Sequence, residues 1–192
     1  MKKIAFAGIM IAAGAAWAGS AEADGTDFVV TAAAGESYTN SAAIGDYARL
    51  VKRGAGEVVL TAATTAFAGA VVIEEGTLSL TVLGAVGAKT PVTVASGATL
   101  YFKTPKAAGQ TTKRFSDHPV TISGDGVDGK GAIRFLPPDG AGYDDSLLGV
   151  VNLAADATIE CDYRWGVHGN NSGILNLNGH TLKRIWNDSA SS

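Results

Sequence analysis

After residue 24 the chain consists of short runs in which apolar and polar residues alternate, separated by Gly, Asp, Asn and Ser. This period of two predicts β-strands, and helical periodicity is almost absent from the same stretch. Most of the runs hold only four to six residues. The predicted strands are Phe28–Thr31, Glu57–Thr61, Ala70–Glu74, Thr77–Val82, Pro91–Val94, Thr99–Phe102, Val120–Ser123, Ala132–Phe135, Gly149–Leu153, Thr158–Cys161, Ile174–Leu177 and Thr181–Ile185.

The strands recur in a repeated unit of strand, two-residue corner, Gly and strand. Val71–Leu80 aligns with Val92–Phe102 once a single residue is inserted after the Gly. The Gly spacings set the period: 20 residues from Gly56 to Gly76, 21 from Gly76 to Gly97, 34 from Gly97 to Gly131, and 42 from Gly131 to Gly173. We interpret the step of 42 as two coils and the step of 34 as one coil that carries an insertion.

A period near 20 residues with short strands predicts an all-β fold of the β-solenoid type, with a two-sheet β-sandwich as the alternative. About 170 residues at this period predict roughly seven or eight coils. Alternation places one side of each strand in a continuous core. The residues expected inside are Val58, Leu60, Val71, Ile73, Leu78, Leu80, Leu100, Phe102, Val120, Ile122, Ile133, Phe135, Leu175 and Leu177. Those expected to face solvent are Glu57, Ser79, Tyr101, Thr121, Arg134 and Asn176.

The N-terminal segment has the three parts of a secretory signal peptide. Lys2 and Lys3 precede an apolar stretch at Ile4–Ala16, and small residues allow cleavage after Ala18 or after Ala23. The polar start Asp24-Gly25-Thr26 favours the second site. We therefore expect residues 1–23 to be a signal peptide and residues 24–192 to form one mature domain.

The composition of the mature domain limits its partners and its stabilisation. Without residues 1–23 the formal net charge is about −4. The sequence has no basic patch, which argues against nucleic acid as a partner. Cys161 is the only cysteine, so no disulfide can form within the chain. We expect Cys161 to be a small buried apolar residue, and stability to come from packing and backbone pairing.

One stretch resembles a known repeat. Leu50–Thr61, the aromatic-x-Gly of Phe67-Ala68-Gly69 and the close Gly76-Thr77-Leu78 are similar to the autotransporter-associated β-strand repeat. The match extends over Leu50–Leu80, and Gly87–Leu100 resembles the coil that usually follows. Leu175–Leu182 resembles a further phrase of such passengers.

The resemblance implies a right-handed parallel β-helix, as in the secreted passenger region of autotransporters. It also implies a location outside the cell or at the bacterial outer membrane, with surface glycans or other cell-surface molecules as partners. Such proteins usually end in an outer-membrane translocator barrel, whereas this sequence stops at Ser192 without a run of amphipathic strands. We therefore expect no membrane anchor of its own, and a truncated passenger is one explanation.

Candidate chemical groups are few, and none forms a catalytic set. Hard oxygen ligands for calcium could come from the Gly-rich stretch after Phe115, although it lacks the closing Glu of an EF-hand and does not iterate. Its aspartates are Asp117, Asp125, Asp128, Asp139, Asp144 and Asp145. His118, His168 and His180 lack metal-ligand spacing, and His180 suits a turn. Tyr163, Trp165 and Trp186 could stack on sugars, but capping the last coil is the favoured role.

These observations predict no catalytic, cofactor-binding or metal-binding residues. The expected function is an exported structural or adhesive module with no catalysis of its own. The alternative is a carbohydrate-active β-helix that cleaves acidic polysaccharides, supported only by the aspartates and by Arg134 near them in sequence.

Overall fold

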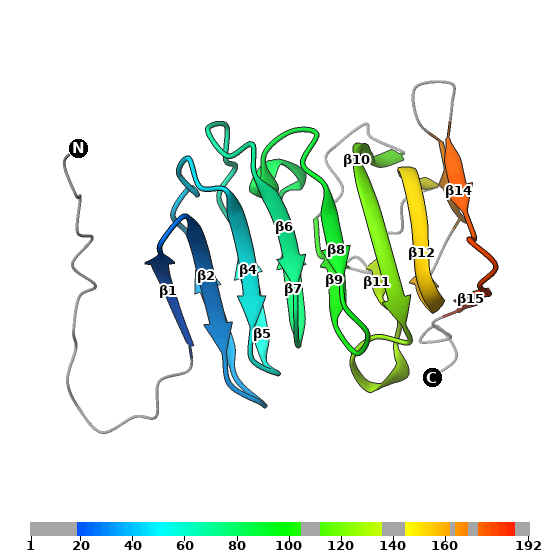
Figure 1. Ribbon diagram of the computed structural model, residues 1–192, viewed down its shortest axis with the longest axis horizontal. Coiled ribbons are helices and arrows are strands. Elements are labelled where there is room, and N and C mark those ends of the chain that lie inside the picture. The colour runs from blue at the N-terminus through cyan, green and yellow to red at the C-terminus, as the bar shows by residue number, and fades with distance from the viewer. Residues whose placement is uncertain (1–18, 105–111, 136–144, 162–163, 169–172, 187–192) are drawn as a thin grey trace.

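The fold was obtained as a computed structural model and is described for residues 19–104, 112–135, 145–161, 164–168 and 173–186. These residues form coils stacked along the long axis of the molecule (Figure 1). All strands join one 15-stranded sheet that winds around the core. The elements are β1 (Gly19–Asp24), β2 (Asp27–Ala32), β3 (Ser37–Asn40), β4 (Arg49–Arg53), β5 (Glu57–Leu60), β6 (Ala70–Ile73), β7 (Thr77–Leu80), η1 (Leu83–Val86), β8 (Val92–Val94), β9 (Thr99–Phe102), β10 (Thr112–Gly124), η2 (Val127–Gly129), β11 (Ile133–Phe135), β12 (Asp145–Cys161), β13 (Arg164–Val167), β14 (Ile174–Asn176) and β15 (Leu182–Ile185).

The coils stack through two parallel ladders of strands. The first face contains β2, β4, β6, β8, β10, the middle part of β12, and β14. The second face contains β3, β5, β7, β9, β11, the last part of β12, and β15. The predicted β-solenoid is confirmed and the β-sandwich alternative is excluded, because successive strands of each face pair in parallel.

The core follows from the alternation along each strand. On the first face one inward column is Leu50, Val71, Val92, Val120 and Val151, in direct register. On the second face Val58, Leu78, Leu100, Ile133 and Ile159 form the matching column. Every member of both columns is buried. The strands therefore pair through their backbones, and the side chains at equivalent positions of consecutive coils fill one apolar core.

Most of the predicted inward positions are confirmed, but two are wrong. Leu175 and Leu177 are 41% and 43% exposed because no described strand stacks beyond β14. The prediction that Ser79 faces solvent is also wrong. Ser79 is buried, since its hydroxyl donates to Glu57 and the Glu57 carboxylate pairs with Lys103 at 2.5 Å.

The prediction of seven or eight coils is wrong, because the structure has about 6 turns. The early steps are regular, with Leu50, Val71 and Val92 in register at intervals of 21 residues. Later coils are longer, since Val92 pairs with Val120 and Val120 with Val151. Gly131 and Gly173 are also not two coils apart on one face. Gly131 precedes β11 on the second face, whereas Gly173 precedes β14 on the first.

The third side of each coil changes along the stack. In the early coils it consists of loops that stack on one another, with the Ile44 amide donating to Thr64 Oγ1 at 3.1 Å and the Thr64 amide to Gly84 O at 2.8 Å. In the later coils strands take over, because the first residues of β10 and β12 pair with each other and β12 also pairs with β13. Extra residues thus lengthen a coil without interrupting the two main ladders.

Glycine is required where corners of consecutive coils meet. Gly76 has φ +67°, and a Cβ there would lie 2.4 Å from the carbonyl oxygens of both Gly54 and Gly56. A side chain would therefore force the corners of two coils apart, in a backbone region that L-residues rarely adopt. At Gly97, by contrast, a Cβ would meet no atom within 4 Å, so the positive φ of +82° rather than crowding favours glycine there.

Candidate functional site

Among the described residues, Lys52 is the most deeply buried charged group. Lys52 lies on β4 in the inward column between Val30 and Ile73, and it is fully buried. Its ammonium donates to Arg53 O at 2.9 Å, Gly54 O at 2.5 Å and Glu75 O at 2.9 Å. All three N–H donors of the amine are thus matched to carbonyl acceptors.

The Lys52 contacts join two coils at their corners. Arg53 is the last residue of β4 and Gly54 follows it, whereas Glu75 belongs to the corner after β6 in the next coil. Burial lowers the pKa of the Lys52 amine to about 8, and the nearby Glu75 carboxylate opposes that shift. We interpret Lys52 as a structural residue, because its buried amine donates all of its hydrogen bonds to backbone carbonyls and does not reach the surface.

The outer surface of the second face carries a band of paired charges around one aromatic ring. Tyr101 on β9 has the Lys103 amine 5.0 Å and the Arg134 guanidinium carbon 4.7 Å from its ring centre. Arg134 on β11 also pairs with Glu160 on β12. Lys103 pairs with Glu57 on β5, two strands away, so the ion pairs of this band link neighbouring coils and coils one further apart.

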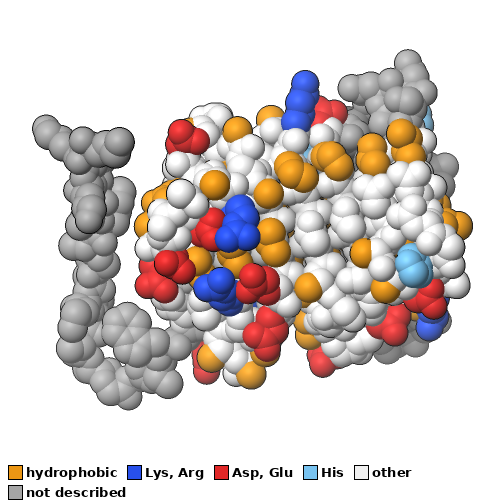
Figure 2. All heavy atoms as spheres, in the orientation of Figure 1, with side chains coloured by type: hydrophobic (Ala, Val, Ile, Leu, Met, Phe, Trp, Pro, Cys, Tyr) orange, Lys and Arg blue, Asp and Glu red, His pale blue; other side chains and the backbone are white. Residues whose placement is uncertain are grey.

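The first face is divided along the stack. Charged side chains of both signs gather over its N-terminal strands, and the surface over β8 to β12 is mostly uncharged (Figure 2). Arg49 pairs with Asp27 on the preceding coil at 2.5 Å, and Arg53 pairs with Glu74 on the next at 2.9 Å. The hydrogen bond from Arg49 lowers the pKa of the Asp27 carboxyl and raises that of the Arg49 guanidinium.

The aspartate-rich stretch does not converge on one point in the part of the chain that the structure describes. Asp125 accepts a hydrogen bond from the Thr158 hydroxyl, which ties the corner after β10 to β12. Asp128 is exposed, with φ +54° in η2, and Asp117 is exposed on β10. Asp139 and Asp144 lie outside the described residues, as does the side chain of Asp145. No group of three or more His, Cys, Asp or Glu residues that could hold a metal occurs among the described residues.

The three histidines occupy separate places. His118 is buried and stacks on Phe115 with ring centres 3.8 Å apart, and its Nδ1 lies 3.0 Å from Thr90 Oγ1. Burial lowers its pKa. His180 lies in the predicted turn, where its amide donates to Leu177 O at 2.8 Å. His168 is exposed after β13.

Cys161 and the aromatic residues near the end of the chain have different environments. Cys161 is buried in the core, as predicted. Trp165 on β13 packs against the core, whereas Trp186 is 58% exposed and lies against Arg184, 4.5 Å from the guanidinium carbon to the ring centre. Capping of the last coil by Trp186 is therefore wrong. Tyr163 lies outside the described residues.

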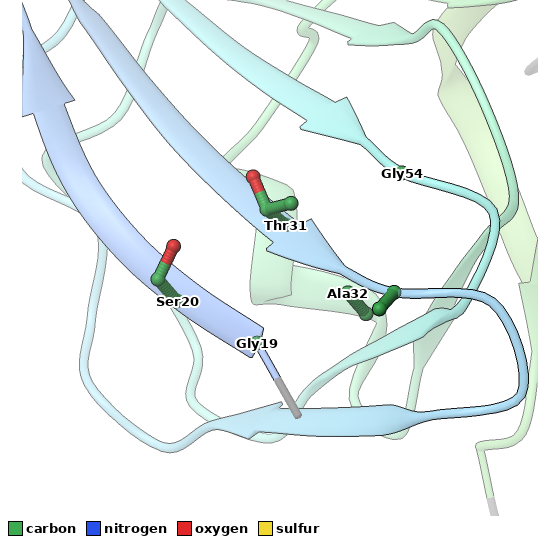
Figure 3. A pocket seen from close by; sticks show the side chains of 6 residues that line it. Gly19, Ser20, Thr31, Ala32 and Gly54 are labelled. Atoms are coloured by element: carbon green, nitrogen blue, oxygen red, sulfur yellow. The ribbon is translucent and has the colours of Figure 1, made fainter. Parts of the chain in front are cut away.

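A hollow of about 330 Å³ opens at the N-terminal end, lined by Gly19, Ser20, Thr31, Ala32, Ala33 and Gly54. Figure 3 shows that β1, the end of β2 and the chain after β4 border it. Among the described residues that line it, the polar side chains are the hydroxyls of Ser20 and Thr31. With no titratable or metal-ligating group in its lining, the hollow has no acid–base chemistry to offer.

Comparison with known proteins identifies one segment. Residues 50–80 match the family model of the passenger-associated-transport-repeat. Neither a curated protein nor a solved structure was found to match the chain. The match begins at Leu50 on β4 and ends with β7, so it covers two successive coils and includes Lys52, Gly54 and Gly76.

The match and the solenoid together support an autotransporter passenger β-helix repeat protein. A repeat of this kind implies a secreted or cell-surface protein. In the described part of the chain, no helix combines the length and the apolar character needed to cross a bilayer.

Proposed function

From a passenger-associated-transport-repeat built into two coils of a β-solenoid, we propose that this chain is an exported structural or adhesive module of an autotransporter-type surface protein, with no catalysis of its own. The match at residues 50–80 is the observation that carries the proposal. The signal peptide expected at the N terminus supports export.

The construction of the coils supports a mechanical role. Apart from the strands at the ends of the stack, each strand of the two ladders pairs with a strand of the coil before it and of the coil after it, and the inward columns give the stack a continuous core. Side chains add links between coils, through Lys52 inside and through Arg49, Arg53 and Arg134 outside. Such a stack resists bending and can hold its loops and flat faces away from a membrane.

The distribution of charged groups favours recognition over turnover. Acid–base catalysis needs titratable side chains that converge on a substrate in a cleft. Here the described ion pairs link neighbouring strands on the outer faces, and the hollow at the N-terminal end lacks titratable residues. Surface glycans or other cell-surface molecules are the partners that we propose for these faces.

The test of location uses the full chain, residues 1–192, produced in a bacterium that has an outer membrane. We expect the protein in the periplasmic, surface or culture-medium fraction, folded and rich in β-structure by circular dichroism. Retention of the soluble full-length protein in the cytoplasm would contradict the proposal.

The test of activity uses the exported protein from the same culture. We expect binding to a subset of a glycan array or to whole cells, and no turnover of uronic-acid polysaccharides. Turnover that is lost in Asp125→Ala or Asp128→Ala and kept in the control Asp46→Ala, an exposed aspartate in another loop, would establish the carbohydrate-active alternative instead.

A further inference from the structure

The first described strand differs from the others in direction. β1 runs antiparallel to β2, with all six of its residues in register from Gly19 opposite Ala32 to Asp24 opposite Asp27. Every other strand pair in the described residues is parallel. Gly25, at φ +64°, lies in the tight turn between the two strands.

β1 covers the edge of the first coil. It pairs the backbone groups of β2 that face away from β4, and Ala21 packs against the core beside β2. Val30 and Ala32 of β2 are fully buried. An antiparallel strand at this end also removes a parallel edge that would otherwise accept another chain, which is the usual task of a solenoid cap.

The packed part of the chain extends to Gly19. A Cβ on Gly19 would lie 2.3 Å from Thr31 O and 2.4 Å from Tyr38 Cβ, so this position is closely fitted against β2 and β3. Gly19, at the start of β1, also lines the hollow in Figure 3. Gly19 directly follows Ala16-Trp17-Ala18, one of the two sequences that suit signal peptidase.

We propose that signal peptidase cleaves the Ala18–Gly19 peptide bond, so that β1 remains as the N-terminal cap of the exported solenoid. Water is the second reactant: Ala18 leaves as the carboxylate of the signal peptide, and Gly19 becomes the charged N terminus beside the hollow. Cleavage after Ala23 would instead remove five of the six residues of β1 and expose the edge of β2. The small-residue rule accepts both sites, and only cleavage at the first leaves all of β1 in the exported protein. This inference rests on the export proposed above.

The primary experiment is to determine the N terminus of the exported full-chain product by Edman sequencing and intact mass. We expect Gly19. A product that begins at Asp24 would overturn this inference and leave the proposed export intact. An uncleaved precursor held in the cytoplasm would contradict both.

Two matched substitutions test the cleavage site independently. Ala18→Tyr places a bulky residue at the −1 position, and we expect the uncleaved precursor to accumulate. Ala23→Tyr makes the same change at an exposed position of β1, and we expect processing at the wild-type rate. The reverse pattern would show that cleavage follows Ala23.

A second pair tests the cap. Ala21→Asp places a charge where β1 packs against the core, whereas Ala23→Asp places it in solvent on the same strand. We expect both to be cleaved after Ala18, and only Ala21→Asp to lower the urea midpoint of the exported protein. Equal midpoints for the two variants would overturn the assignment of β1 as a cap.

Discussion

At the scale of single residues, Lys52 stands out as a charge placed in an apolar column. A buried ammonium is tolerated only when its donors are satisfied, and here three carbonyl oxygens at two corners accept them. The same contacts explain why a lysine belongs between Val30 and Ile73, where alternation would place an aliphatic residue.

Replacing Lys52 with Met keeps the apolar stem and removes the donors. Three corner carbonyl oxygens then lose the donor that the buried Lys52 amine supplied, and we expect a loss of about 2–4 kcal/mol in the free energy of unfolding. The control is Lys183→Met, at an exposed position of β15, which should change it by less than about 0.5 kcal/mol. Urea denaturation measures both, and equal small effects would show that the corner contacts contribute little.

His118 should make the stability of the protein sensitive to acid. Burial lowers its pKa in the folded state, so the unfolded chain binds a proton first as the pH falls through about 6.5. The folded state is therefore favoured above this range, and we expect the free energy of unfolding to fall between pH 7 and pH 5. In His118→Gln the decline over this interval should be smaller. Parallel curves for the two proteins would contradict this assignment.

At the scale of elements, alternation identified the strands that have one apolar and one polar side. β5, β7 and β9 begin at the residues predicted from the sequence, and the two strands predicted at Gly149–Leu153 and Thr158–Cys161 are parts of the single strand β12. β3 and β4 were not predicted from the pattern, because Ser37–Asn40 is polar and Arg49–Arg53 carries three basic residues. Their strand conformation is imposed by the neighbouring coils.

The candidate site was less predictable than the strands for a physical reason. The partners of Lys52 are backbone carbonyls, and the pattern of side chains in the sequence does not predict which carbonyls accept its hydrogen bonds. The band around Tyr101 includes residues far apart in the sequence, such as Tyr101 and Arg134 or Arg134 and Glu160, which become neighbours only through the ladder. Sequence reasoning could name Arg134 and Tyr101 as outward residues but could not pair them.

A charge on the inward side of a strand should destroy the coil that contains it. Leu78 is fully buried between Val58 and Leu100, so Leu78→Asp places an unpaired carboxylate in the core. We expect a loss of more than about 4 kcal/mol and a product that trypsin degrades. Thr93→Asp, on the exposed side of β8, is the control and should remain folded. A soluble, trypsin-resistant Leu78→Asp protein would contradict the inward assignment.

At the scale of the whole molecule, the two ends of the described stack are unequal. At the N-terminal end the antiparallel strand β1 covers the edge of β2, whereas Ile174, Leu175 and Leu177 remain 47%, 41% and 43% exposed at the other end. Repeat spacing could not reveal this difference, because it treats every coil alike. The same limitation led to the overestimate of the coil number, since insertions after β9 lengthen the later turns.

The difference between interior and terminal coils can be measured with one substitution at two places. Leu50 and Leu175 occupy the same inward column, but Leu50 is fully buried and Leu175 is not. Leu50→Ala leaves a cavity between two coils and should cost about 2–5 kcal/mol, whereas Leu175→Ala should cost less than about 1 kcal/mol. Urea denaturation gives both values. Hydrogen exchange should also be faster for the amides of β14 than for those of β4, since a coil with one neighbour opens more easily than a coil with two. Equal costs at the two leucines would show that the column is covered beyond β14 in solution. If a second copy of the chain provides that cover, the cost at Leu175 should rise with protein concentration.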